Sequence, residues 1–263
     1  MESYLEVFSS FEALFNLITL VVLEIVLGID NIIFIAIICG YIPNRRDQKR
    51  ARFIGLMLAL VVRVMLLSTI NLITKMVDPF FHLGHIPVTG RGLILFAGGA
   101  FLIIKTISEI YHKFKVADKE ESAKSRQMTW TQAILQITLI DIVFSFDSII
   151  TAVGVTADNP NAALALATMV MAVVIAMIAM LLFAPYVSDF IEKYPTIKML
   201  ALSFLVVIGL ILVVEALEDA HVIHMPEGLN IKVYGYVALA FSLIVETLNI
   251  RLKNVKERKL KSN

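Results

Sequence analysis

Residues 24–36 read Glu24-Ile-Val-Leu-Gly-Ile-Asp30-Asn31-Ile-Ile-Phe-Ile-Ala, and residues 141–153 read Asp141-Ile-Val-Phe-Ser-Phe-Asp147-Ser148-Ile-Ile-Thr-Ala-Val. The two stretches align position by position. In each copy an acid comes first, and a second acid followed by a small polar residue comes six positions later. The other residues are apolar or small. Because a buried carboxylate needs a partner or a function, these four acids are the first candidates for a functional site.

The composition is that of a membrane protein. Hydrophobic residues make up 59% of the chain, against about 45–50% in soluble domains. Charged residues make up 17%, against about 25%, and they are concentrated in short connectors between long apolar runs. A membrane span needs roughly 20 mostly apolar residues. This pattern excludes a soluble globular domain, and the single cysteine, Cys39, excludes an internal disulfide and a cysteine-based zinc site.

Hydropathy predicts an all-α membrane protein with seven transmembrane helices. Proline interrupts helices, and the seven prolines are expected between the spans or at their ends. The predicted spans cover residues 11–40, 52–75, 91–112, 131–157, 162–184, 197–217 and 230–250.

Basic residues predict the orientation of these spans. They gather in connectors 41–52 and 112–130, before Leu200, and in the tail after residue 250. The alternate connectors contain no Lys or Arg. Since basic connectors stay on the cytoplasmic side, the N-terminus is expected outside and the C-terminus inside the cytoplasmic membrane, the inner membrane of the cell.

The order of the spans then predicts an inverted repeat. The first copy of the repeated stretch runs inward and the second runs outward, so the two copies are antiparallel. Residues 11–112 form the first half, residues 131–217 form the second, and span 230–250 is added to them. The whole chain, residues 1–263, is expected to form a single transmembrane domain. Many secondary transporters are built in this way and bind substrate near the membrane midplane.

Helix geometry separates the two acids of each copy. Residues six apart point about 240° from each other in a regular helix. Glu24 and Asp30 would reach one site only if the helix unwinds near Gly28-Ile29, and the second copy would have to unwind near Ser145-Phe146. Gly, Ser, Asp and Asn tolerate such a local break.

Charge counting predicts that the spans bind a cation or protons. An ionisable residue inside a span costs at least ~2.5–3.5 kcal/mol. The spans contain basic residues at Arg63 and Lys105, with Glu109 near the cytoplasmic end, so pairing neutralises only part of the negative charge. Oxygen ligands suit hard cations such as Mg²⁺, Ca²⁺ and Mn²⁺. The acids within the spans are Glu24, Asp30, Asp141, Asp147, Glu215 and Glu246.

The sequence resembles the TerC family of integral membrane proteins over essentially its whole length. The resemblance rests on Glu24-x5-Asp30-Asn31, Asp141-x2-Phe144-Ser145-x-Asp147-Ser148, Arg63, Gly90-Arg91-Gly92-Leu93 with Gly98-Gly99, residues 198–204, and residues 228–249. The family is named for tellurite resistance, is associated with metal-ion homeostasis and above all manganese efflux, and is similar in build to LysE-type exporters.

This resemblance implies a metal site and a substrate. Mn²⁺ would be the transported substrate, with Ca²⁺ or Mg²⁺ as alternatives, and no organic cofactor is expected. Gly28 stands where many members have Ser, which removes one hydroxyl ligand. The ion site implied by the resemblance comprises Glu24, Asp30, Asn31, Asp141, Asp147 and Ser148.

Roles other than ion binding are predicted for the remaining charged residues in the spans. Arg63 is expected to be a counter-ion or lock that holds the empty site closed. Lys105 and Glu109 are four residues apart and are expected to pair on one helix. Glu215 and Glu246 are left open between a proton relay and structural hydrogen bonding.

The predicted function is export of a divalent cation by a membrane protein that is not an enzyme. Its partners are the metal ion and the lipid bilayer, and no nucleic acid is expected. A homo-oligomer or a complex with other membrane proteins stays open. The alternatives are an intramembrane aspartyl hydrolase, whose two acids would share a proton, and a membrane scaffold in a tellurite or stress response.

Overall fold

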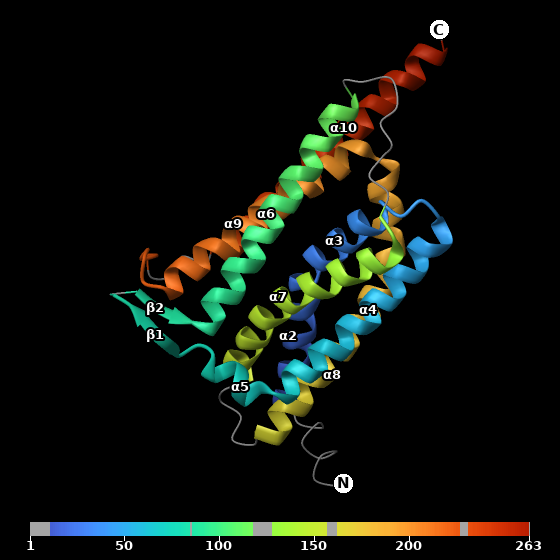
Figure 1. Ribbon diagram of the computed structural model, residues 1–263. Helices are drawn as coiled ribbons and strands as arrows, with labels where there is room; N and C mark the ends of the chain where they lie inside the picture. Colours follow the sequence, from blue (N-terminus) through green and yellow to red (C-terminus); the bar gives the residue numbers. More distant parts are fainter. Residues whose placement is uncertain (1–10, 85, 118–127, 157–161, 227–230, 263) are drawn as a thin grey trace.

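The computed structural model describes residues 11–84, 86–117, 128–156, 162–226 and 231–262. Within these residues, seven helical segments are long and apolar enough to cross a membrane, so the predicted class and the seven spans are confirmed (Figure 1). The helices are α2 (Phe11–Leu27), α3 (Ile29–Cys39), α4 (Arg45–Ser68), α5 (Ile70–Lys75), α6 (Gly90–Ala117), α7 (Trp130–Thr156), α8 (Ala162–Lys193), α9 (Pro195–Asp219) and α10 (Ile231–Ser262).

Several helices extend beyond their predicted spans. Most of the predicted connector 41–52 is helical, because α4 begins at Arg45, where the Asn44 side chain accepts a hydrogen bond from the Arg46 backbone N–H at 3.0 Å. The basic residues after residue 250 continue α10 to Ser262. Hydropathy detects the apolar part of a helix, and it therefore misses these charged extensions.

The expectation that every proline lies between spans or at their ends is wrong for Pro185. This residue lies inside α8, which continues to Lys193. Because proline has no backbone N–H, it cannot donate to the Leu181 carbonyl one turn earlier. Pro195 lies in the first turn of α9, where the missing N–H leaves no helical hydrogen bond unmade.

A short antiparallel hairpin, which the sequence did not predict, interrupts the connector after α5. It pairs β1 (Pro79–Leu83) with β2 (Ile86–Thr89). Gly84 in its turn has a φ of 66°, a conformation that glycine adopts without strain. Phe80 and Phe81 are exposed on the hairpin.

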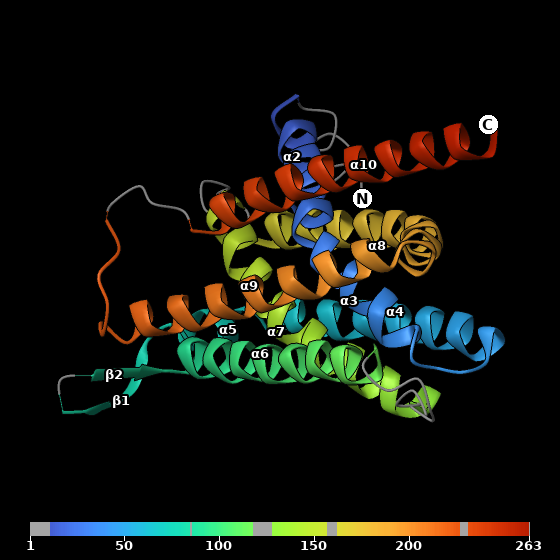
Figure 2. The ribbon, with the colours of Figure 1, turned by 90° about the horizontal axis from the view of Figure 1, so that it is seen from above.

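The α6–α9 pair makes the most extensive contact between helices (Figures 1 and 2). A Cβ atom on Gly99 would lie 2.6 Å from the Gly209 carbonyl oxygen, and one on Gly209 would lie 3.0 Å from the Gly99 carbonyl oxygen. Only residues without a side chain let two helix backbones approach this closely. The two glycines therefore determine how closely α6 and α9 pack.

The other helices pack in two corresponding pairs. Helix α4 lies against α7, and α2 and α3 lie against α8. An inverted repeat would relate the first span to the fourth and the second span to the fifth. It would therefore make the contact of the second span with the fourth equivalent to the contact of the first span with the fifth. The inverted repeat itself stays a prediction.

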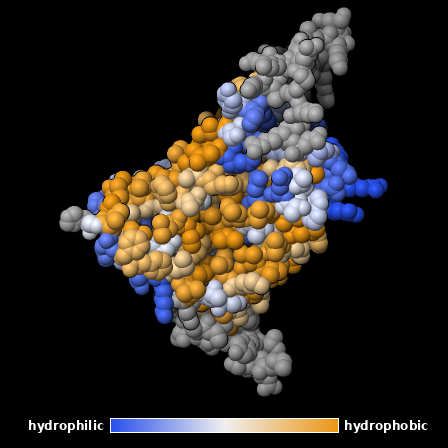
Figure 3. All heavy atoms as spheres, in the orientation of Figure 1, coloured by the Kyte–Doolittle hydropathy of each residue, from blue (hydrophilic) through white to orange (hydrophobic). Residues whose placement is uncertain are grey.

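Charged and apolar side chains are separated along the molecule. Figure 3 shows a broad hydrophobic band with hydrophilic side chains toward its two ends. The basic starts of α4 and α9 lie at the end opposite the β1–β2 hairpin (Figure 1). The predicted topology requires this grouping, and the assignment of the basic end to the cytoplasm stays a prediction.

Helix α10 lies at the edge of the bundle (Figure 2). Only 11% of its apolar stretch is buried, against 59% for the first span. It packs mainly on α9. Its first turn nevertheless carries a lysine, Lys232, that reaches the interior of the protein.

Candidate functional site

Five buried polar residues from α2, α3, α4 and α7 form one group, which we call the arginine cluster. Arg63 is 2% exposed and Glu24 is 2% exposed, so this pair is almost completely removed from the surface. Such burial is tolerated only if the charges are paired and hydrogen-bonded. The members are Glu24, Asn31, Arg63, Asp141 and Ser145.

Arg63 bridges the two carboxylates of the arginine cluster. Its Nη1 pairs with Glu24 Oε2, and its Nη2 lies 3.5 Å from Asp141 Oδ1. Its Nε donates to Ser145 Oγ at 2.9 Å, and that hydroxyl donates to Asp141 Oδ2 at 3.1 Å. Asn31 Nδ2 donates to Asp141 Oδ1 at 3.1 Å. The first acids of both copies of the repeat therefore share one guanidinium group.

A second group, which we call the lysine cluster, joins α6, α7, α9 and α10. Lys232 Nζ pairs with Asp147 Oδ2 and lies 3.1 Å from Glu215 Oε1. Arg91 pairs with Asp219, and its Nη2 lies 3.3 Å from Asp147 Oδ1. Asp147 is therefore held between two cations from different helices.

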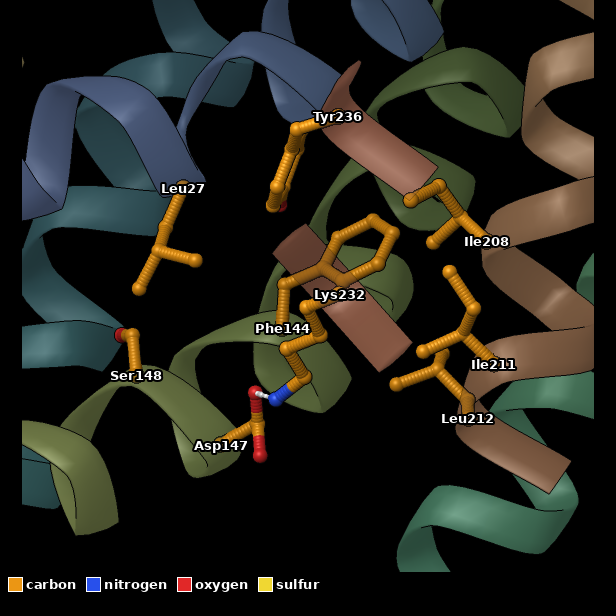
Figure 4. A pocket seen from close by; sticks show the side chains of 9 residues that line it. All are labelled: Leu27, Phe144, Asp147, Ser148, Ile208, Ile211, Leu212, Lys232 and Tyr236. Atoms are coloured by element: carbon orange, nitrogen blue, oxygen red, sulfur yellow. Dashed lines mark hydrogen bonds and ion pairs between the residues drawn. The ribbon is translucent and has the colours of Figure 1, made fainter. Parts of the chain in front are cut away.

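A small pocket lies at Asp147. Figure 4 shows the Asp147 carboxylate and the Lys232 ammonium group meeting in it, with Ser148 nearby. Its volume is about 20 Å³, which is about the space that one water-sized group needs. The other lining residues are apolar or aromatic: Leu27, Phe144, Ile208, Ile211, Leu212 and Tyr236.

A wider cleft of about 970 Å³ lies beside this pocket, between α2, α9 and α10. Glu215, Glu218 and Thr151 contribute polar groups to its wall. The cleft and the small pocket share Leu27, Lys232 and Tyr236 as lining residues. Lys232 therefore stands between the Asp147 pocket and the larger opening.

Both clusters contain buried oxygen atoms without a hydrogen-bond partner among the described residues. In the arginine cluster this is Asn31 Oδ1, and in the lysine cluster these are Glu215 Oε2 and Asp219 Oδ2. Arg91 Nη2 lies 3.9 Å from Glu215 Oε2, which is too far for a hydrogen bond. Leaving a buried acceptor without a donor costs free energy. Each cluster could therefore accept a further proton or positive charge.

The structure places five of the six predicted ion ligands, and these five lie in two places. Glu24, Asn31 and Asp141 belong to the arginine cluster, whereas Asp147 and Ser148 line the small pocket. The backbone of Asp30 is part of α3, but its side chain lies outside the described residues. The five described side chains thus lie in two groups, and the ion site itself stays a prediction.

Helix continuity explains this distribution. Helix α7 is unbroken at Ser145-Phe146, so the unwinding that would bring Asp141 and Asp147 to one site does not occur there. At Gly28 the break is limited to one residue, because Gly28 N–H donates to Glu24 O at 2.9 Å and Ile32 N–H donates to Gly28 O at 3.1 Å. Asp141 and Asp147 consequently point to different sides of α7, as regular helix geometry requires.

The supporting residues also occupy different places. Lys105 Nζ lies 2.7 Å from Glu109 Oε1 on α6, which is the pairing expected from their spacing. Glu215 belongs to the lysine cluster. Glu246 lies on α10 apart from both clusters and accepts a hydrogen bond from Asn249 at 3.5 Å.

A tyrosine lies near Glu109 at the basic end of the bundle. Lys198 Nζ lies 4.9 Å from the centre of the Tyr41 ring. Burial raises the pKa of Tyr41, and the negative charge of Glu109 raises it further. The phenol therefore stays protonated at neutral pH.

The sequence-based charge count was wrong because it missed Arg91 and Lys232. Both lie among the first residues of predicted spans and were not included in the count. Asp219 was also missed. A search for inward-facing charged residues at the ends of every predicted span would have identified Arg91, Lys232 and Asp219.

Among the residues whose side chains are described, no three His, Cys, Asp or Glu side chains are close enough together to hold a metal ion. Internal cations hold the carboxylates in this arrangement. Metal binding would therefore require Arg63 or Lys232 to release a carboxylate.

Comparison with known proteins places the chain in a family. The model of the integral membrane protein TerC family matches residues 9–261. The chain belongs to the TerC family. Like its relatives that are named inner membrane proteins, this TerC family member is a multi-pass protein of the inner membrane.

Its relatives include a UPF0053 protein of Haemophilus influenzae, 41% identical over 244 residues, which are 93% of this chain and 96% of the relative. The UPF0053 inner membrane protein YgdQ of Escherichia coli K12 is 42% identical over 238 residues, 90% of this chain and 92% of YgdQ. YoaE of the same organism is 40% identical over 89% of this chain, which covers 42% of YoaE. No solved structure matches the chain.

Proposed function

We propose that this TerC family protein exports a divalent metal cation, with manganese as the first candidate, across the cytoplasmic membrane. The observation that carries the proposal is the surplus of carboxylates in both clusters. The arginine cluster has two carboxylates and one guanidinium group, and the lysine cluster has three carboxylates and two cations. The buried oxygens that have no hydrogen-bond partner among the described residues also indicate that each cluster lacks positive charge.

The ligand chemistry favours a hard cation. The available donors are carboxylate, amide and hydroxyl oxygens, which suit Mn²⁺, Ca²⁺ and Mg²⁺. The volume of the Asp147 pocket, about 20 Å³, suits a single dehydrated ion. Apolar walls strengthen the attraction between such an ion and the carboxylate.

Lys232 occupies the place that the transported ion would take. Its ammonium group bridges Asp147 and Glu215, and α10, which carries it, packs mainly on α9. A shift of α10 would withdraw the ammonium group and connect the small pocket to the wide cleft. The ion would replace Lys232 at Asp147 and then leave through the cleft.

Export of a cation against an inside-negative potential is uphill by about 2.3 kcal/mol per charge per 100 mV. Coupling to inward proton movement would supply this energy. A carboxylate that has lost its cation in an apolar pocket takes up a proton readily. The surplus carboxylate of each cluster is therefore the expected proton carrier.

Transport into proteoliposomes tests the proposal. We expect a Mn²⁺ flux in the unmodified protein, and we expect Asp147→Asn and Asp141→Asn to lower it by about tenfold or more, since each removes a charge on which the ion depends. Glu246→Gln is the matched control, because Glu246 is a carboxylate in a span but lies outside both clusters. Undiminished flux in both aspartate variants would contradict the site assignment.

The alternatives predict different results. An aspartyl hydrolase needs two carboxylates that share a proton, whereas Asp141 and Asp147 are each paired with a cation. A scaffold predicts that charge-removing variants keep full function. Deleting the gene and measuring whole-cell metals separates the classes, because only an exporter predicts a selective rise in manganese.

A further inference from the structure

A cavity with a basic wall lies between α4 and α8 and contains no residue of either cluster. Its volume is about 270 Å³. Lys49 and Leu56 lie three or four residues from both Arg52 and Phe53, so the four α4 residues in its wall share one side of the helix. The wall is formed by Lys49, Arg52, Phe53, Leu56, Leu181 and Pro185.

Arg52 is a buried cation that forms no ion pair with the described residues. The residue is 7% exposed, and its Nη2 donates to Ser188 Oγ at 2.7 Å. Ser188 is itself fully buried and is neutral, so it cannot compensate the charge. The Arg52 Nε is buried and has no hydrogen-bond partner in the described part of the chain. A buried guanidinium group in this state needs an anionic partner.

Among the described residues, the carboxylate one turn beyond Ser188 on α8 is paired with another arginine. That carboxylate belongs to Glu192, which pairs with Arg45 at 3.6 Å. No ion pair of Arg52 is found among the described residues. Lys49 adds a second positive charge to the same wall and is exposed.

The rest of the cavity wall is apolar. Phe53 is 57% exposed, whereas Leu56 is buried below it on the same face of α4. Leu181 and Pro185 form the opposite wall on α8. A ligand that fits here has an anionic group near Lys49 and Arg52 and an apolar chain that follows the helices toward the middle of the bundle.

We propose that this cavity binds one anionic phospholipid. The phosphate would lie between Lys49 and Arg52 and accept a hydrogen bond from the guanidinium group of Arg52, which lines the cavity. An acyl chain would lie against Phe53, Leu56 and Leu181. The cavity opens near the start of α4, at the basic end of the bundle, where anionic head groups bind pockets between membrane helices.

Thermal unfolding of the full chain in a neutral detergent tests this proposal. Dioleoylphosphatidylglycerol should raise the melting temperature, whereas dioleoylphosphatidylcholine, which has the same chains and no net charge, should not. Arg52→Gln should weaken phosphatidylglycerol binding by about tenfold, the value of a hydrogen bond to a charged group. Arg50→Gln, an exposed arginine two positions away on α4, should bind like the unmodified protein.

Two further variants keep the proposal testable if Arg52→Gln does not fold. Lys49→Gln changes an exposed residue and should weaken binding, and Leu181→Trp should block the cavity while both charges remain. Unchanged phosphatidylglycerol binding in these variants would overturn the proposal. An equal effect of phosphatidylcholine would also overturn it, as would an equal effect of inorganic phosphate alone, which would assign the cavity to free phosphate.

Discussion

Arg63 is the residue on which the buried interior depends most. It contacts Glu24, Ser145 and Asp141, which come from two other helices. Removing one partner of a buried ion pair leaves the other charge buried and uncompensated. This change lowers the free energy of unfolding by more than the intact pair contributes to it. The network is therefore expected to respond very differently to single and paired substitutions.

We expect Arg63→Met to lower the free energy of unfolding by about 3–5 kcal/mol, because Glu24 and Asp141 would be left buried without a cation. Adding Glu24→Gln to Arg63→Met should recover part of this loss. Unfolding followed by tryptophan fluorescence in mixed micelles measures both variants. An equal loss in the single and double variants would contradict the shared role of Arg63.

Lys232 offers a second test at the residue scale, and it depends on the proposed transport function. Lys232→Met should raise the affinity for Mn²⁺ by about tenfold or more, because the ammonium group no longer competes for Asp147 and Glu215. Lys232→Arg keeps the charge and serves as the control. Titration calorimetry of the purified protein gives both affinities, and equal values in the two variants would show that Lys232 does not compete with the ion.

Among the secondary-structure elements, α6 and α9 form the most extensive contact. Their backbones meet at Gly99 and Gly209, and they carry Arg91, Glu215 and Asp219 of the lysine cluster. Any side chain at the crossing would push the two helices apart. The spacing of these charges thus depends on two residues that have no side chain.

We expect Gly209→Val to destabilise the protein by about 1–3 kcal/mol through overpacking, since even a Cβ atom there would lie 2.7 Å from Ile103 Cγ1 and 3.0 Å from Gly99 O. Leu210→Val changes the neighbouring residue, which is 51% exposed, and should have little effect. Melting temperatures in detergent compare the two variants. A stable Gly209→Val protein would mean that the crossing can widen at low cost.

On the scale of the whole molecule, charge is separated along the bundle. The basic ends of the helices gather at one end, and the hairpin with Phe80 and Phe81 lies at the other. Positive residues resist transfer across the membrane, so the whole molecule has one favoured orientation.

A fluorescent-protein fusion tests this orientation. Green fluorescent protein at the C-terminus should fluoresce, because that end is predicted to lie in the cytoplasm, while alkaline phosphatase inserted at the hairpin should be active. The reciprocal fusions are the controls. Activity of alkaline phosphatase at the C-terminus would reverse the predicted topology.

The number of spans and the membrane class follow from the sequence alone. A long apolar run is stable in the bilayer, and there a helix forms all of its backbone hydrogen bonds internally. The sequence also identified Glu24, Asn31, Asp141 and Arg63 as exceptional, because charged and polar groups in such runs are costly.

Only the tertiary structure decided which groups meet. Arg91 and Lys232 lie far from Asp147 in the sequence, and their pairing depends on how α6, α7 and α10 are rotated about their axes. Those rotations follow from packing, including the contact between Gly99 and Gly209, which hydropathy does not encode. The repeated stretch therefore identified residues of both buried clusters, while the continuity of α7 placed Asp141 and Asp147 in different clusters.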